Sequence, residues 1–111
     1  MAKRKDKTAN ILGTDYVVHF ATEEEDPGLK GLNGYCLTIG KKIVIESHPE
    51  PDTINDTVEK RTLRHELLHA FLYESGLDNE APWADCEEQL VDWIAIQFPK
   101  MVKVMKETNA L

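Results

Sequence analysis

Alternating hydrophobic and polar positions in the first half of the chain predict strands. Residues 14–21 (TDYVVHFA) carry aromatic and β-branched residues at every second position, as a half-buried strand does. Residues 35–39 and 42–46 are two further short runs of strand-forming residues, and Gly40-Lys41 between them favours a tight hairpin. We therefore expect a short three-stranded antiparallel sheet.

Helical spacing replaces this alternation after the two prolines near residue 50. Asp52 or Thr53 can cap the start of a helix, and no breaker follows until Gly76, a residue type that commonly ends helices. The expected helix has one apolar stripe, formed by Ile54, Val58, Leu68 and Leu72.

A second helix is predicted in the last third of the chain. Pro82 suits the first position of a helix, and Pro99 is expected to end that helix at Phe98. A weaker helical pattern continues through residues 100–111. Its expected inward side chains are Met101, Val104 and Met105.

The amino-terminal residues lack both patterns. Residues 1–12 open with a basic cluster and continue without an apolar stretch, so we expect a disordered basic arm. The chain as a whole, residues 1–111, is expected to form a single small α+β domain in which the sheet packs on the two helices.

Charge and composition exclude several classes of protein. The 13 Lys and Arg residues against 20 Asp and Glu residues give a net charge of −7, which argues against a nucleic-acid partner. No apolar run approaches the length of a bilayer span, so no membrane partner is expected. Because no export signal is evident, Cys36 and Cys86 are expected to be reduced thiols of a cytoplasmic protein.

One stretch of the first helix, RHELLHA at residues 64–70, carries the residue types of a catalytic metal site. His65 and His69 are four residues apart, so a helix places both imidazoles on one face, where they can bind one Zn²⁺. Glu66 between them can act as general base on the zinc-bound water. Apolar neighbours indicate a sheltered helix. The alternative is a surface helix that carries two histidines and binds no metal.

A catalytic zinc takes three protein ligands, and the second helix offers two adjacent candidates for the third. Glu88 shares a helical face with Asp92, a carboxylate that can accept the outer N–H of a ligand histidine. Glu87 instead shares its face with apolar residues, which favours burial. We favour Glu88 as the ligand and Asp92 as the carboxylate that supports a ligand histidine. Glu87 remains the alternative ligand, and is otherwise a solvated or capping residue.

The stretches HELLHAFLYESGL and EEQLVDWIA together resemble the gluzincin arrangement of zinc metallopeptidases. They also resemble the small ImmA/IrrE-like and minigluzincin-like proteins of phages and prokaryotes, over roughly residues 39–98. The resemblance implies a zincin-like domain in which residues 42–46 form the edge strand that binds an extended peptide. Leu72 and Ser75 stand where the metzincin pattern requires glycine and histidine, so that subgroup is excluded.

The function that this resemblance implies is a zinc-dependent metallopeptidase acting on a peptide or protein substrate. Larger gluzincins add a histidine or tyrosine that stabilises the oxyanion, and Tyr73, Tyr35 and His48 match that role by residue type alone. Ordinary structural roles are the alternative for all three. The small size favours a second hypothesis, a regulatory protein on a zincin scaffold, such as a phage or mobile-element factor that acts on a repressor or host protein.

Overall fold

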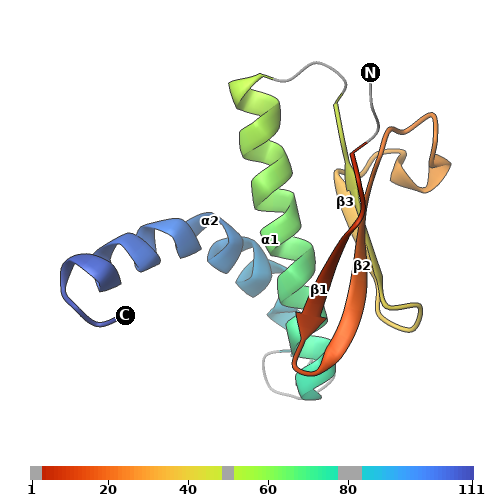
Figure 1. Cartoon of the computed structure of the whole chain (residues 1–111). Coiled ribbons are helices and arrows are strands. Elements are labelled where there is room, and N and C mark those ends of the chain that lie inside the picture. The colour runs from red at the N-terminus through yellow and green to blue at the C-terminus, as the bar shows by residue number, and fades with distance from the viewer. Residues whose placement is uncertain (1–3, 49–51, 78–83) are drawn as a thin grey trace.

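The computed structural model describes residues 4–48, 52–77 and 84–111, and within these ranges it is an α+β fold of two α-helices and a four-stranded mixed sheet (Figure 1). Neither of these helices is long and apolar enough to cross a lipid bilayer. The elements in chain order are β1 (Lys7–Ile11), β2 (Thr14–Ala21), the 3-10 turn η1 (Pro27–Leu29), β3 (Gly34–Leu37), β4 (Lys42–Glu46), α1 (Thr53–Ser75), the 3-10 turn η2 (Ala84–Cys86) and α2 (Glu87–Glu107).

The strands lie in the order β1-β2-β4-β3. β1 pairs antiparallel with β2. β3 pairs antiparallel with β4, so the predicted hairpin is confirmed, but its first strand ends at Leu37 and residues 38–41 form the connection, which is longer than the predicted tight turn at Gly40-Lys41. Between the two hairpins, β2 and β4 run parallel, with Val18 opposite Ile43. The prediction of a three-stranded antiparallel sheet was therefore wrong, since a fourth strand is present and one pairing is parallel.

The position of β4 also corrects the expected edge strand. Residues 42–46 are central in the sheet, and the edge on their side is β3. Ile43, Val44 and Ile45 are all 0% exposed. A continuous apolar run of this kind belongs to a strand that is covered on both faces, whereas an edge strand usually alternates.

The amino-terminal arm is partly ordered. Residues 1–12 were expected to be disordered, but Lys7–Ile11 form β1, and residues 1–3 lie outside the described ranges. Leu12 (φ 51°) and Gly13 (φ 96°) both adopt left-handed conformations, which is the backbone of a two-residue hairpin turn. Ile11, before the turn, is 2% exposed. Burial of this one large side chain and the ladder with β2 hold a strand whose other residues are polar or small.

A different part of the chain packs on each face of the sheet. The face beneath α1 forms the larger core, made by Ile11, Tyr16, Val18, Phe20, Ile43 and Ile45 with Ala70 of the helix. On the opposite face Val44 packs with Ala21 and Leu29, so the connection that contains η1 covers it. Figure 1 shows α1 running alongside the strands on one side of the sheet, with the connection between β2 and β3 on the other side.

Helix α1 has the predicted ends but a different buried face. The Asp52 side chain accepts a hydrogen bond from the Asn55 backbone N–H, and Gly76 (φ 81°) ends the helix in a left-handed conformation. The buried residues of α1 are Thr62, Glu66 and Ala70, at intervals of four, and Leu63 and Leu67 beside them also pack against the sheet core. Among the predicted apolar positions, Ile54 is 76% exposed, so that stripe does not form the core contact.

Helix α2 extends beyond its predicted end. It runs from Glu87 to Glu107 with Pro99 inside it, while the predicted start, Pro82, lies outside the described ranges. A proline lacks the N–H that would bond the carbonyl four residues earlier, which here belongs to Ala95. The Nε of Arg64 on α1 donates to that carbonyl oxygen at 2.7 Å. The helix continues because a side chain replaces the missing donor.

The last turns of α2 have few neighbours. Figure 1 shows the carboxyl-terminal half of the helix leading away from α1 and the sheet. Val104 is 58% exposed and Met105 37% exposed, so the expectation that these two side chains point inward was wrong, whereas Met101 is half-buried. The amino-terminal half, by contrast, packs on α1 through Val91 and Ala95, which are both buried.

Candidate metal centre

His65 and His69 lie side by side on α1, near the point where α2 crosses it. Their four-residue spacing brings the two Nε2 atoms within 3.2 Å of each other, with ring centroids 4.9 Å apart. Each imidazole is 18% exposed. The pair is therefore sheltered but still reachable from solvent, as a ligand pair must be.

Glu88 of α2 completes a group of three possible ligands. Its Oε1 lies 2.5 Å from His69 Nε2, and its Oε2 lies 3.5 Å from His65 Nε2. Ligand atoms of the three residues all lie within 4.8 Å of one another, and no other such group occurs in the described ranges. Two imidazole nitrogens and one carboxylate oxygen are a donor set that suits Zn²⁺ and leaves one coordination position open. The structure thus brings Glu88, and not Glu87, to the Nε2 atoms.

Both outer nitrogens of the histidines contact carboxylates. Asp92 Oδ1 lies 2.8 Å from His65 Nδ1; the sequence had predicted a histidine partner for Asp92 without saying which of the two. Glu87 Oε2 lies 2.9 Å from His69 Nδ1. Each carboxylate can accept an Nδ1–H, which leaves the Nε2 lone pair directed at the space shared with Glu88.

The contact of Glu87 was missed in the sequence analysis, which gave this residue a solvated or capping role as the alternative to ligation. Its side chain is 19% exposed, whereas that of Glu88 is 66% exposed. Where they are in contact, the two helices run in opposite directions. A residue one turn later on α1 therefore contacts a residue about one turn earlier on α2. That rule, applied from the His65–Asp92 pair, leads from His69 to Glu87.

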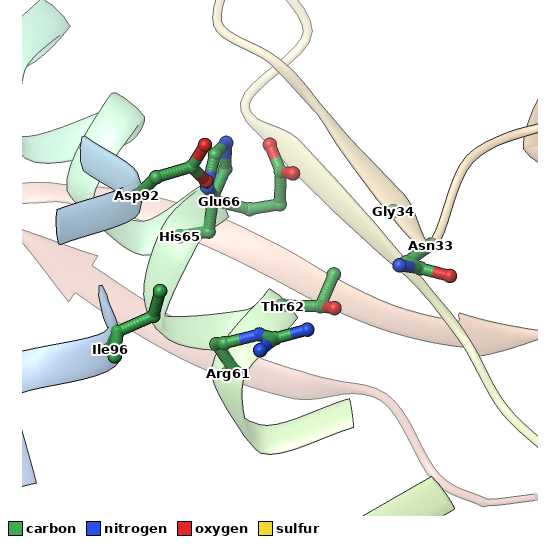
Figure 2. A pocket seen from close by; sticks show the side chains of 8 residues that line it. All are labelled: Asn33, Gly34, Arg61, Thr62, His65, Glu66, Asp92 and Ile96. Carbon is green, nitrogen blue, oxygen red and sulfur yellow. The ribbon is translucent and has the colours of Figure 1, made fainter. Parts of the chain in front are cut away.

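Glu66 lies on the sheet side of the two histidines. It is 8% exposed, and burial raises the pKa of its carboxyl group, while the neighbouring imidazoles act in the opposite direction. Figure 2 shows its carboxylate directed away from the His65 ring and into the space between α1 and Gly34. A buried carboxylate beside the ligand group is placed to exchange a proton with a water molecule there.

Two cavities meet at Glu66. One, of about 410 Å³, is lined by Asn33, Gly34, Arg61, Thr62, His65, Glu66, Asp92 and Ile96 (Figure 2). The other, of about 420 Å³, is lined by residues of β3, by Leu32 and Thr38 beside it, and by both histidines, Glu66, Glu87 and Glu88. Because Gly34, His65 and Glu66 belong to both, the cavities form one groove between β3 and the helices.

Gly34 sets how closely β3 approaches α1. A Cβ atom at this position would lie 2.8 Å from the Thr62 Cγ2 atom and 2.8 Å from the Val44 carbonyl oxygen. No side chain fits in that space, so glycine is required where the strand passes the helix beside Glu66. This contact fixes the position of β3 against α1 at the point where both cavities are lined by Gly34 and Glu66.

The three candidates for an oxyanion-stabilising residue have other partners or positions. The Tyr35 hydroxyl donates to Asp26 Oδ2 at 2.5 Å, and this bond raises the pKa of Tyr35 to about 12. The Tyr73 ring lies 4.9 Å from the Lys41 ammonium group, and His48 Nε2 lies 3.7 Å from Glu46 Oε1. Neither Tyr73 nor His48 lines the groove. Tyr35 lines one cavity of the groove, but its side chain packs against the Ala21, Leu29 and Val44 cluster and its hydroxyl is held by Asp26, so the structure brings none of the three polar groups to the histidines.

No protein-family model, curated protein or solved structure matches this chain.

Proposed function

We propose that the chain is a zinc-dependent peptidase, with His65, His69 and Glu88 as ligands and Glu66 as general base. The observation that carries the proposal is the convergence of the three ligand atoms within 4.8 Å, with a carboxylate on each outer histidine nitrogen. An accidental pair of helix histidines has no need of two such carboxylates. Bound zinc would supply a Lewis acid that polarises the peptide carbonyl and promotes ionisation of water.

Three carboxylates of the chain orient the histidines and transfer the proton. Asp92 and Glu87 hold the two imidazoles in the tautomer that keeps Nε2 free for the ligand role. Glu66 takes a proton from the attacking water and delivers it to the leaving amine, so the same carboxylate serves both steps. Its low exposure, 8%, leaves it reachable only from the groove, where the substrate would bind.

The groove favours an extended peptide as the substrate. β3 is the edge of the sheet, and it lines the groove through Gly34, Tyr35 and Cys36. A peptide that pairs with this edge would cross Glu66, with one cavity on each side of the bond to be cleaved. In this proposal β3 takes the place of β4, which the resemblance to zincins had implied as the docking strand.

Zinc content tests the proposal directly. Protein purified without added zinc is expected to carry about one equivalent, and His69→Ala and Glu88→Gln are expected to lose it. Glu66→Gln is expected to retain the metal and to lose cleavage of a quenched-fluorescent peptide library. Glu107→Gln, at an exposed position near the far end of α2, makes the same change of charge and is the matched control. Parent protein that binds no zinc would overturn the proposal.

A regulatory protein on the same metal scaffold is the second candidate, and the exposed side chains of α2 favour it. Trp93 is 56% exposed, Phe98 48% exposed and Val104 58% exposed. Apolar side chains of this size on one helix are typical of surfaces that bind other proteins. Partner binding that survives Glu66→Gln would support this candidate over hydrolysis.

A further inference from the structure

Three basic side chains of α1 precede or enter the histidine motif, and two of them have partners. Lys60 Nζ lies 3.2 Å from Asp56 Oδ2, and Arg64 donates to the Ala95 carbonyl. Arg61 makes no hydrogen bond or ion pair with any residue in the described part of the chain. An arginine carries its charge at every physiological pH, so Arg61 presents a permanent cation that none of those residues neutralises by contact.

Arg61 lies one helical turn before His65, on the same side of α1, and lines the cavity that Glu66 and His65 also line. Figure 2 shows its guanidinium group extending from the helix toward the side of the cavity where Asn33 lies. The Asn33 carboxamide likewise has no hydrogen-bond partner among the described residues. The Arg61 guanidinium and the Asn33 carboxamide, neither of which bonds to another described residue, therefore both line the cavity beside Glu66.

The acidic groups of this cavity do not take up the Arg61 charge. Asp92 is engaged with His65 Nδ1 at 2.8 Å, and Glu66 is buried among the helix and β3. The chain has a net charge of −7, yet this cavity contains a guanidinium group that no acidic residue lining it pairs with. A guanidinium binds a carboxylate through two parallel hydrogen bonds, which gives it selectivity as well as attraction.

We propose that Arg61, assisted by Asn33, binds a carboxylate of the peptide substrate next to the bond that is cleaved. This inference rests on the proposed peptidase function and names its substrate class. Four residues of helix span about 6 Å, and an extended peptide advances about 3.3 Å per residue. The carboxylate therefore lies one or two residues from the scissile bond. It belongs either to an Asp or Glu side chain or to the free carboxyl terminus of the peptide.

Binding to a hydrolytically silent protein tests this inference separately from catalysis. Zinc-loaded Glu66→Gln protein is titrated with pools of fluorescent heptapeptides, and anisotropy gives the Kd. One pair of pools differs by Glu against Gln at a single position, and a second pair by a free acid against an amide at the carboxyl terminus. One carboxylate pool is expected to bind about 10- to 100-fold more tightly than its neutral counterpart. The pair that shows the difference identifies the source of the carboxylate.

Arg61→Gln in the same background is expected to remove the difference, and Lys60→Gln is the control with the same change of charge one residue away. Arg61→Glu is expected to reverse the preference toward peptides that carry lysine. Equal Kd values within both pairs, a preference that survives Arg61→Gln, or no binding of either pool would overturn the inference. Cleavage by the parent protein, measured with the same pools, decides the peptidase proposal independently.

Discussion

Glu87 and His69 are joined across the two helices, with Oε2 of the carboxylate 2.9 Å from Nδ1 of the imidazole. Asp92 and His65 make the same kind of contact one turn earlier on α1. Helix α1 thus provides both imidazoles, and the carboxylates that contact them, those of Glu87, Glu88 and Asp92, come from α2. The candidate centre is a property of the helix pair, and neither helix contains it alone.

Removal of the Glu87 carboxylate is expected to weaken zinc binding without abolishing it. Glu87→Ala leaves all three ligands in place but frees the His69 ring to rotate and to change tautomer, a loss that commonly costs about 10- to 100-fold in metal affinity. Competition with a chromophoric chelator measures the effect. Glu107→Ala on the same helix is the control. If Glu87→Ala bound zinc as tightly as the parent, the contact between Glu87 and His69 would not contribute to metal binding.

Zinc is expected to stabilise the folded chain, because the ligands come together only when α2 is packed on α1. At a free zinc concentration 100 times Kd, linkage gives about 2.7 kcal/mol. For a domain of this size that corresponds to a rise of about 10 °C in Tm. A chelator should reverse the rise. Glu66→Gln should show it and His69→Ala should not, so a rise in both variants would place the metal elsewhere.

Acid is expected to weaken the contact that ties the end of α1 to the sheet. Glu74 Oε2 accepts from Lys41 Nζ and from the Tyr16 hydroxyl, both at 2.7 Å. The bond from Lys41, and then that from Tyr16, lowers the pKa of Glu74 below its usual value. Since the folded pKa is the lower one, this contribution to stability is complete above the unfolded pKa of about 4.3 and is lost as pH falls through the folded pKa.

Urea unfolding between pH 6 and pH 3 measures this acid dependence. Glu74→Gln is expected to flatten it over the lowest part of that range. The hydroxyl of Tyr16 stays protonated throughout, because burial and its bond to Glu74 raise its pKa further. Glu107→Gln, at the exposed end of α2, should leave the parent dependence unchanged. An identical slope in Glu74→Gln and the parent would rule out this assignment.

The bond between Arg64 and the Ala95 carbonyl is expected to matter only because Pro99 is present. Arg64→Met should cost about 1 to 3 kcal/mol, since the carbonyl then lacks any donor. Pro99→Ala restores the helical N–H, so in that background the same substitution should cost less. A double-mutant cycle by urea unfolding gives the coupling. Equal costs of Arg64→Met in both backgrounds would show that the bond does not compensate for the proline.

Local patterns in the sequence predicted the elements better than their assembly. The antiparallel pairing of β3 with β4 and the limits of α1 follow from short-range chemistry, in which the Asp52 side chain and Gly76 act on their immediate neighbours at the two ends of the helix. Strand β1 escaped notice because Ile11 is its one large buried side chain, and a ladder at a sheet edge needs little more. The parallel contact between β2 and β4 depends on how the connection of residues 22–33 is folded, which no periodicity records.

The candidate site divides in the same way. His65, Glu66 and His69 are neighbours on one helix, so their spacing alone placed them together. The choice of Glu88 over Glu87 depended on the rotation of α2 about its own axis, which the sequence indicated only through Asp92. Arg61 gave no signal at all, because an exposed arginine on a helix is ordinary until the opposite wall of the groove is known.

The parallel contact between β2 and β4 has a consequence for the order of folding. β1–β2 and β3–β4 are each local hairpins that close on the microsecond scale, whereas their joining must bring together residues that are distant in the chain. The strand that lines the groove, β3, belongs to the second hairpin, which joins the first only through the pairing of β2 with β4 and otherwise packs on α1. We therefore expect the groove beside Glu66 to be completed among the last events of folding, and to be among the first regions to exchange amide hydrogens in the native state.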